Sequence, residues 1–83
     1  MFWKIADELY TLAKKALQET KHHIQFEMNG RAIHVWIEEA GRTNNTRFDG
    51  IYDIYNKDTL SERSLNDYEA ARAHLERLLK EHT

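Results

Sequence analysis

Residues 24–39, with the sequence IQFEMNGRAIHVWIEE, alternate apolar and polar side chains on both sides of an Asn-Gly pair. Alternation with a period of two is typical of β-strands, and Asn and Gly best tolerate the positive φ angles of a two-residue hairpin turn. The segment therefore predicts two antiparallel strands joined at Asn29-Gly30. This turn predicts the pairs Met28–Arg31, Phe26–Ile33, Ile24–Val35 and His22–Ile37 on one face, and Glu27–Ala32, Gln25–His34 and His23–Trp36 on the other. The first face is the expected core side, because a slip by one residue would turn its apolar side chains to water.

Two segments have the three-to-four-residue spacing of apolar side chains that indicates an amphipathic helix. The first covers residues 2–17. The second has its expected buried stripe at Leu65, Tyr68, Ala71, Leu75 and Leu78. Ser64 with Asp67 forms a weak capping box at its start, and Thr59 with Glu62 offers an earlier start. The sequence thus predicts one helix before the strands and one helix after them along the chain.

Residues 48–55, FDGIYDIY, have the aromatic and β-branched content of a third strand. Two alternations compete in it, with either Phe48, Tyr52 and Ile54 or Ile51 and Tyr55 pointing inward. We favour the first, and note that Gly50 is a place where a β-bulge could switch the face partway along the strand.

The predicted order is α-β-β-β-α, an α+β fold in which a three-stranded antiparallel meander carries both helices on one face. Residues 1–83 suit a single domain and leave no room for a second. A composition of 41% apolar and 31% charged residues is typical of folded proteins, and the net charge of −2 gives no overall attraction to nucleic acid or membranes. The absence of cysteine excludes disulfides and favours the cytoplasm. The first helix has no uninterrupted apolar run, so we expect neither a signal peptide nor a membrane span.

A sheet covered by helices on one side leaves its other face open to solvent or to a partner. That face would carry His23, Gln25, Glu27, His34 and Trp36, joined by Asp53 and by Ile51 or Tyr55. Tryptophan is one of the residue types that anchor protein interfaces. Two interpretations stay open. The indole of Trp36 lies flat on the sheet over His23, or it anchors a surface for a protein partner or a second copy of the chain.

Trp3 and Tyr10, seven residues apart, widen the apolar stripe of the first helix beyond what one contact needs. The simpler interpretation is that this helix contacts both the sheet and the other helix. The alternative is a second interaction patch, in which Trp3 and Tyr10 meet across the twofold axis of a homodimer.

Five histidines raise the question of a metal site. In the predicted register His23 and His34 are diagonal neighbours, but further ligands are missing, because Gln25 and Glu27 are weak or poorly placed candidates. The sequence has no nucleophile elbow, no glycine-rich phosphate loop and no cysteine nucleophile. It therefore predicts no metal, no cofactor and no enzymatic activity.

The predicted element order resembles that of the double-stranded RNA-binding domain, over nearly the whole chain but as topology alone. The resemblance implies a longer loop between the first two strands and a lysine cluster at the start of the last helix. Here the loop is a tight turn and that helix begins SLNDYEAAR, with Asp67 and Glu69, so no functional residue carries over. Arg42 and Arg47 in the segment GRTNNTR are able to contact phosphates, which makes nucleic-acid binding an alternative function.

The function that the sequence favours is a small non-enzymatic protein-interaction module of accessory, regulatory or inhibitor type. It would bind a protein partner, or itself, through the open face of the sheet. The expected contact residues are Trp36, His34, His23 and Gln25, with Trp3 and Tyr10 as a second patch. The alternatives are nucleic-acid binding through Arg42 and Arg47, and a homodimer formed through the first helix with no other activity.

Overall fold

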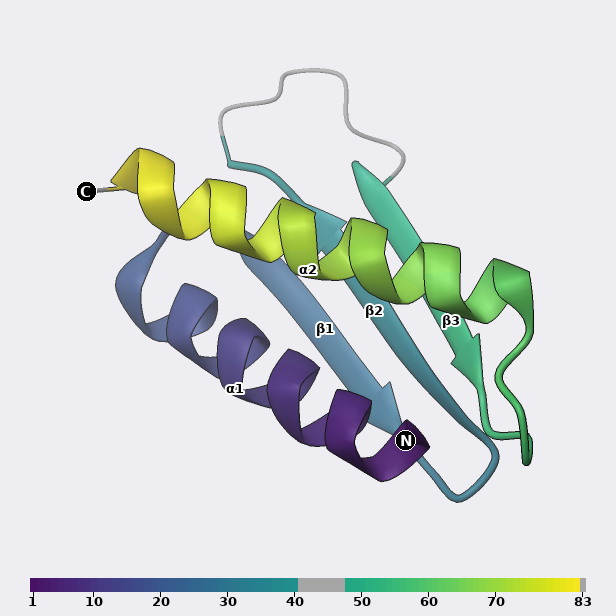
Figure 1. Ribbon diagram of the computed structural model, residues 1–83. Coiled ribbons are helices and arrows are strands. Elements are labelled where there is room, and N and C mark those ends of the chain that lie inside the picture. Colours follow the sequence, from purple (N-terminus) through teal and green to yellow (C-terminus); the bar gives the residue numbers. More distant parts are fainter. Residues whose placement is uncertain (41–47, 83) are drawn as a thin grey trace.

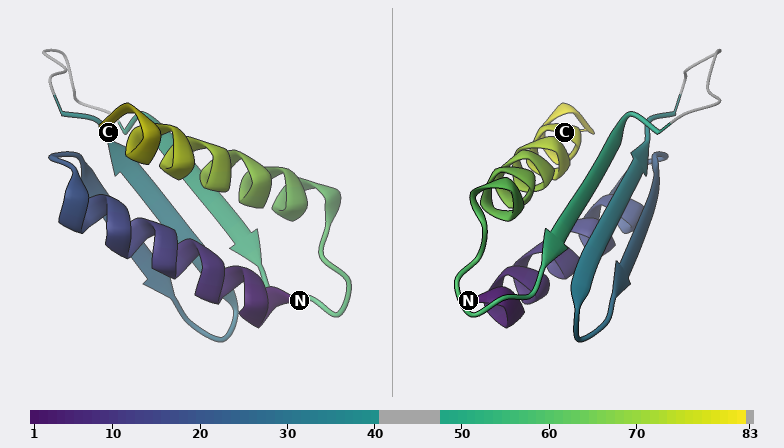
Figure 2. Two further views of the ribbon diagram at one scale, coloured as in Figure 1. Left: turned by 60° about the vertical axis from the view of Figure 1, so that its left-hand side comes forward. Right: turned by 90° about the vertical axis from the view of Figure 1, so that its right-hand side faces the viewer.

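The chain folds into two helices and a three-stranded antiparallel sheet, in the order α1-β1-β2-β3-α2 (Figure 1). The computed structural model describes residues 1–40 and 48–82. The elements are α1 (Phe2–Glu19), β1 (His23–Met28), β2 (Ala32–Glu38), β3 (Gly50–Tyr55) and α2 (Glu62–His82). Figure 2 shows both helices on one side of the sheet, while no described helix or strand covers the other side. The predicted α+β fold is therefore confirmed.

The core lies between the inner face of the sheet and the two helices, which also contact each other. Its fully enclosed side chains include Leu9 of α1, Ile33 and Ile37 of β2, and Leu75 of α2. Burying each of these side chains stabilises the fold by about 1.5–3 kcal/mol, so this layer is the main source of stability. The predicted stripe of α2 is confirmed: Ala71, Leu75 and Leu78 are buried, and Leu65 and Tyr68 pack partly buried against them. Among the described residues, neither helix combines the length and the apolar content needed to cross a membrane.

The hairpin between β1 and β2 turns one residue later than predicted. The backbone N–H of Asn29 donates to the carbonyl of Ala32 (3.0 Å), so Gly30 and Arg31 form the turn. The Asn29 side-chain Oδ1 accepts from the N–H groups of Arg31 (2.7 Å) and Ala32 (3.0 Å), and Gly30 does not adopt a φ between +20° and +160°. An asparagine side chain that bonds to the backbone ahead of it thus replaces the expected mirror-image turn.

This turn makes the predicted cross-strand pairs wrong by two residues. Phe26 pairs with Val35 rather than Ile33, and Ile24 pairs with Ile37 rather than Val35. Because the shift is even, every side chain stays on its predicted face of the sheet. The predicted core side of the hairpin is correct although its partners are not.

In β3 the favoured alternation is correct for the strand and wrong for the residue before it. Ile54 is buried and Tyr52 packs half-buried on the core, while Ile51 and Tyr55 point outward. Phe48 was expected to point inward with them. It precedes the strand, and its ring instead lies 6.4 Å from that of Trp36, on the opposite side of the sheet.

The second helix begins at Glu62, and neither predicted start is correct. Ser61 precedes the helix, and its Oγ accepts from the backbone N–H of Ser64 (3.1 Å), which is the usual geometry of an N-cap serine. Ser64 is buried, and its own Oγ accepts from the N–H of Tyr55 (3.1 Å). Ser64 therefore ties α2 to the end of β3 and does not cap the helix.

Gly50, the first residue of β3, lies where the side chains of Tyr52 on the same strand and His74 on α2 leave no room for a Cβ. A Cβ at this position would lie 2.6 Å from Cε2 and 2.7 Å from the hydroxyl of Tyr52, and 2.8 Å from Nδ1 of His74. Tyr52 and His74 are hydrogen-bonded to each other, so neither can withdraw without losing that bond. Glycine is required here for lack of space.

We expect Gly50→Ala to lower the free energy of unfolding by about 2 kcal/mol, because the added methyl overpacks the contact between Tyr52 and His74. Urea unfolding followed by circular dichroism measures this change. Gly30→Ala is the matched control, since a Cβ there meets nothing within 4 Å, and should change stability by less than about 0.5 kcal/mol. Equal effects of the two substitutions would contradict the close packing at Gly50.

Candidate functional site

The open face of the sheet consists of the outward-pointing side chains of its three strands. Pairing places Gln25, Trp36 and Ile51 in one row across β1, β2 and β3. The residues at outward positions are His23, Gln25, Glu27, Ala32, His34, Trp36, Glu38, Ile51, Asp53 and Tyr55. We call this set the open face. Trp36 lies at its centre and is absent from the buried core.

Four rings form a continuous aromatic row on this side of the sheet: Tyr55, His34, Trp36 and Phe48. The imidazole of His34 stacks on the indole of Trp36, with centroids 5.7 Å apart and planes 6° apart. Tyr55 meets His34 edge-on at 6.3 Å, and Phe48 lies 6.4 Å from Trp36. Tyr55 is 46% exposed and Ile51, beside Trp36, is 54% exposed. Large apolar side chains therefore gather where no described element covers them.

A cross-strand hydrogen bond holds the middle of the aromatic row. Nδ1 of His34 lies 2.6 Å from Oδ1 of Asp53, its neighbour on β3. The backbone N–H of Asp53 donates to Oδ2 of Asp67 on α2 (2.9 Å). Glu27 lies on the other side of His34, on β1. The imidazole orientation, and with it the stack on Trp36, is thus fixed by the sheet.

The structure separates the two histidines that the sequence paired. His23 lies opposite Glu38 and Gln25 lies opposite Trp36, so the predicted pairs His23–Trp36 and Gln25–His34 are wrong. His34 lies opposite Glu27, four residues along the strand from His23, or about 13 Å at the rise of a β-strand. The two rings cannot share one ion. Among residues 1–40 and 48–82, no group of three or more histidine or carboxylate side chains could hold a metal.

The second predicted patch lies on α1. Trp3 is 55% exposed and Tyr10 is 52% exposed, and Leu17, seven residues further, is also exposed. The Tyr10 ring contacts Phe26 of β1 edge-on at 5.6 Å, and Trp3 contacts only its neighbour Phe2 among the ring pairs described. The helix contacts both the sheet and α2, as the simpler interpretation required, mainly through its buried residues and in part through the edge of Tyr10.

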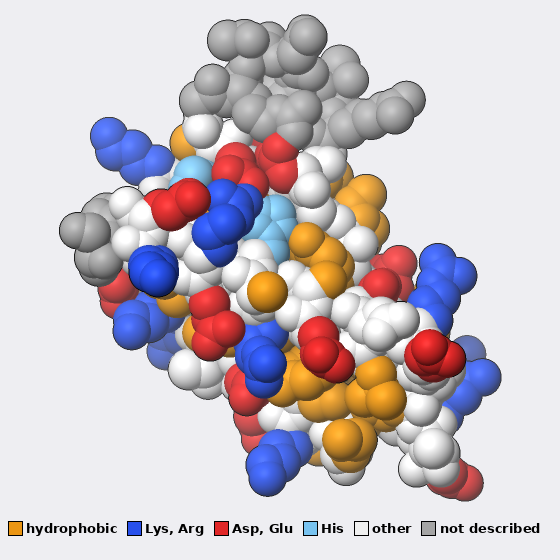
Figure 3. Space-filling view, turned by 45° about the horizontal axis from the view of Figure 1, so that its top comes forward, with side chains coloured by type: hydrophobic (Ala, Val, Ile, Leu, Met, Phe, Trp, Pro, Cys, Tyr) orange, Lys and Arg blue, Asp and Glu red, His pale blue; other side chains and the backbone are white. Residues whose placement is uncertain are grey.

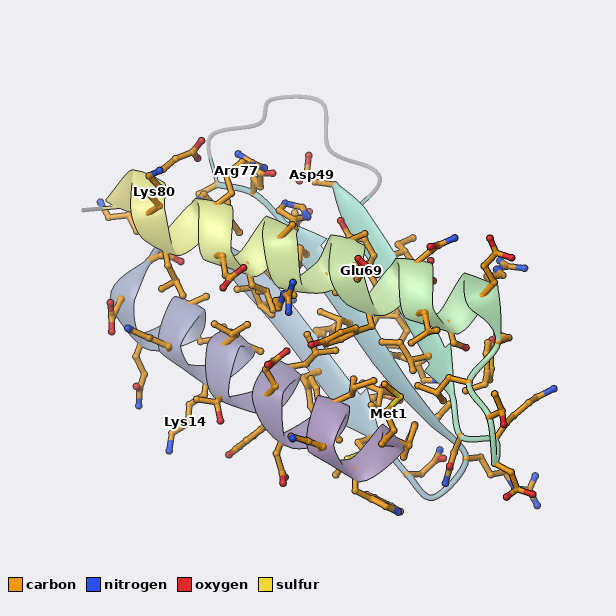
Figure 4. All side chains as sticks on the ribbon, viewed as in Figure 1. Met1, Lys14, Asp49, Glu69, Arg77 and Lys80 are labelled. Carbon is orange, nitrogen blue, oxygen red and sulfur yellow. The ribbon has the colours of Figure 1, made fainter. Side chains whose placement is uncertain are left out.

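A polar cluster that the sequence did not reveal joins α2 to the ends of β2 and β3. Tyr52 and Nδ1 of His74 are 2.8 Å apart, and Nε2 of His74 lies 2.8 Å from Oε2 of Glu39. Arg77 donates to the same carboxylate oxygen (2.7 Å) and also to Glu81. Figure 4 shows Arg77 at the same end of the sheet as Asp49, whose carboxylate accepts from the backbone N–H of Glu39 (2.6 Å).

The electrostatics of this cluster fit a structural role. Burial of Glu39 raises its pKa, but hydrogen bonds from His74 and Arg77 outweigh that effect and leave the pKa lowered. Burial raises the pKa of the Tyr52 phenol. The His74 ring thus lies between the Glu39 carboxylate and the Tyr52 phenol, with one ring nitrogen hydrogen-bonded to each, and no buried side-chain nitrogen or oxygen of the described residues lacks a partner. Tyr52 and Glu39 lie 22 and 35 positions from His74 in the sequence, so no short-range pattern could have indicated the cluster.

The helix side of the molecule carries charges of both signs. The space-filling view shows acidic and basic side chains interspersed over the helices (Figure 3). A groove of about 480 Å³ there is lined by Asp7, Glu8, Thr11, Leu12, Arg72 and Glu76. Arg72 lies 3.8 Å from Glu76, and its guanidinium carbon lies 5.4 Å from the Tyr68 ring centroid. The Tyr68 hydroxyl in turn donates to Glu8. Much of the charge in this groove is thus paired within the chain.

Comparisons with known proteins identify no relative: no family model, curated protein or solved structure matches the chain. The resemblance to the double-stranded RNA-binding domain rests on element order alone. Arg42 and Arg47, the expected phosphate contacts, lie outside the described residues, so that alternative stays a prediction from sequence.

We expect Glu39→Gln to lower the free energy of unfolding at pH 7 by about 1 kcal/mol, because it weakens two charge-assisted hydrogen bonds. The folded-state pKa of Glu39 lies below its ordinary value of 4.5. Its stabilisation is therefore present above pH 4.5 and is lost as the pH falls through the lower folded-state value. Urea unfolding from pH 7 to pH 3 should show the difference from wild type shrinking on acidification. Glu69→Gln, at an exposed position of α2, is the control, and a pH-independent difference for Glu39→Gln would contradict the assignment.

Proposed function

We propose that the protein is a small, non-enzymatic interaction module that binds a protein partner through the open face of its sheet. The single observation that supports this most is the aromatic row centred on Trp36. Its rings lie on the side opposite both helices, and its member Tyr55 and the neighbouring Ile51 are about half exposed. Aromatic side chains in such positions supply large contact areas at low cost in side-chain entropy.

The shape of this face supports a macromolecular partner over a small ligand. Small ligands bind in concave sites that enclose most of their surface, whereas a sheet face presents a shallow surface. The grooves described on the molecule involve the helices and their connections, on residues such as Glu8, Arg72 and Leu78. We place the proposed partner in the cytoplasm because the chain lacks cysteine.

A second candidate is a homodimer formed through α1. It is favoured by the exposure of Trp3, Tyr10 and Leu17, which follow one another at seven-residue spacing along the helix. A stripe of this spacing is typical of a seam between two helices. We prefer the open face over α1 as the binding surface, because its rings pack against each other and are held by the bond between His34 and Asp53.

We expect Trp36→Ser to lower the free energy of unfolding by only about 1 kcal/mol and to weaken partner binding about tenfold or more, because the indole is outside the core and central to the face. Partners captured from the native host with wild-type protein would be purified and titrated against each variant by calorimetry. Trp3→Ser is the matched control and should leave binding unchanged.

Two results would contradict this assignment. If Trp36→Ser unfolds the domain, the indole belongs to the core. If Trp3→Ser abolishes binding and Trp36→Ser does not, the surface is on α1. Sedimentation equilibrium across a concentration series then tests the dimer, which should dissociate in Trp3→Ser.

A further inference from the structure

The middle of the open face carries negative charge. Its outward positions include the carboxylates of Glu27 and Asp53 on either side of His34, and the described strands contain neither lysine nor arginine. This bias is local, because the whole chain has 12 basic and 14 acidic residues and the helix side mixes both signs (Figure 3). The charge of the open face therefore selects among partners.

The carboxylates lie next to the aromatic row rather than at its rim. Glu27, His34 and Asp53 form one row across the three strands, and Trp36 lies on the same face two residues further along β2. Same-face residues two apart in a strand are about 7 Å apart. A cation placed over the indole thus lies within reach of both carboxylates. The contact of 2.6 Å between Nδ1 of His34 and Oδ1 of Asp53 holds that carboxylate beside the ring that stacks on Trp36.

From this geometry we infer that the partner presents arginine side chains to the open face, with a guanidinium lying on Trp36 and facing Glu27 and Asp53. This inference rests on the proposed function and names the chemistry of its partner. A guanidinium stacks on an aromatic plane and binds carboxylates through its fork of N–H donors, which makes arginine a better fit than lysine. The chain already contains this combination on its helix side, where Arg72 lies over the Tyr68 ring and 3.8 Å from the Glu76 carboxylate.

The same charges disfavour the two other occupants. In a twofold dimer of open faces, each face meets a copy of itself, so carboxylates would oppose carboxylates with no lysine or arginine among the strand residues to separate them. Nucleic acid would bring phosphates toward Glu27 and Asp53, whereas its binding depends on neutralising phosphates with cations. A basic protein segment avoids both kinds of repulsion, because its cations are attracted to the carboxylates of the open face.

The probe is the peptide acetyl-Gly-Arg-Gly-Arg-Gly-Arg-Gly-amide. In a Trp3→Phe background Trp36 is the remaining tryptophan of the two in the chain, so its fluorescence reports on the open face alone. We expect a saturable change in Trp36 fluorescence with a dissociation constant of about 1 mM or tighter. Binding should weaken as the salt concentration is raised. The same peptide with citrulline in place of arginine keeps the shape and loses the charge, and it should bind at least about fivefold more weakly.

The variant that tests the carboxylates is Glu27→Gln with Asp53→Asn, which keeps both side-chain shapes. We expect it to weaken binding of the arginine peptide about fivefold or more, as each lost charge pair contributes a small factor. Glu69→Gln removes one charge from α2, on the other side of the molecule (Figure 4), and should leave binding unchanged. Circular dichroism confirms that the double variant is folded, and stabilisation of the fold without weaker binding would count against the inference.

The outcomes separate this inference from the proposed function. Equal binding of the arginine and citrulline peptides, or no effect of the double variant, overturns the arginine preference. If a purified partner binds wild type, loses affinity in Trp36→Ser and is unaffected by the double variant, the proposed function stands and this inference fails. A Trp36-dependent dimer in sedimentation equilibrium, or Trp36-dependent binding of a 20-mer oligonucleotide, overturns it in favour of a second copy or nucleic acid.

Discussion

The burial of one face of a three-stranded sheet under two helices determines the rest of this structure. The sheet places alternate residues on opposite sides, so covering Ile33, Val35 and Ile37 commits His34 and Trp36 to the other side. The described part of this 83-residue chain builds one such apolar layer from two helices and offers no third helix to close a second. The exposed aromatic row is therefore a consequence of the core, and its composition is what calls for a functional explanation.

Most of the fold could be predicted because its signals are local. Period-two alternation predicted the strands and three-to-four spacing predicted the helices, and together they predicted the face of each side chain. The register could not be predicted in the same way, because it depends on which acceptor closes the turn. The Oδ1 of Asn29 accepts two backbone N–H groups and moves the turn by one residue. The predicted starts of α2 were wrong for a similar reason, since Ser61 caps the helix while Ser64 bonds to β3.

The candidate site was predicted only in part, because its contacts join distant segments. Trp36 and His34 follow from alternation within one strand. Phe48 joins them from a position whose face depends on where β3 begins. The cluster of Tyr52, His74 and Glu39 follows no repeat, since the three residues come from α2 and from both sides of the undescribed segment. Such contacts depend on how α2 crosses the sheet, and no local pattern specifies that.

The two sides of the sheet use polar residues in different ways. On the helix side, His74 and Glu39 are mostly enclosed and satisfy each other, so their charges stabilise the fold and offer little to a partner. On the open face, His34 and Asp53 are also bonded, but both remain partly exposed beside Trp36. A bonded pair in that position holds the imidazole that stacks on Trp36, and keeps a carboxylate near it, without needing full burial. Order that is maintained at an exposed surface lowers the entropy cost of binding, and this is the physical basis of our proposal that the open face binds a partner.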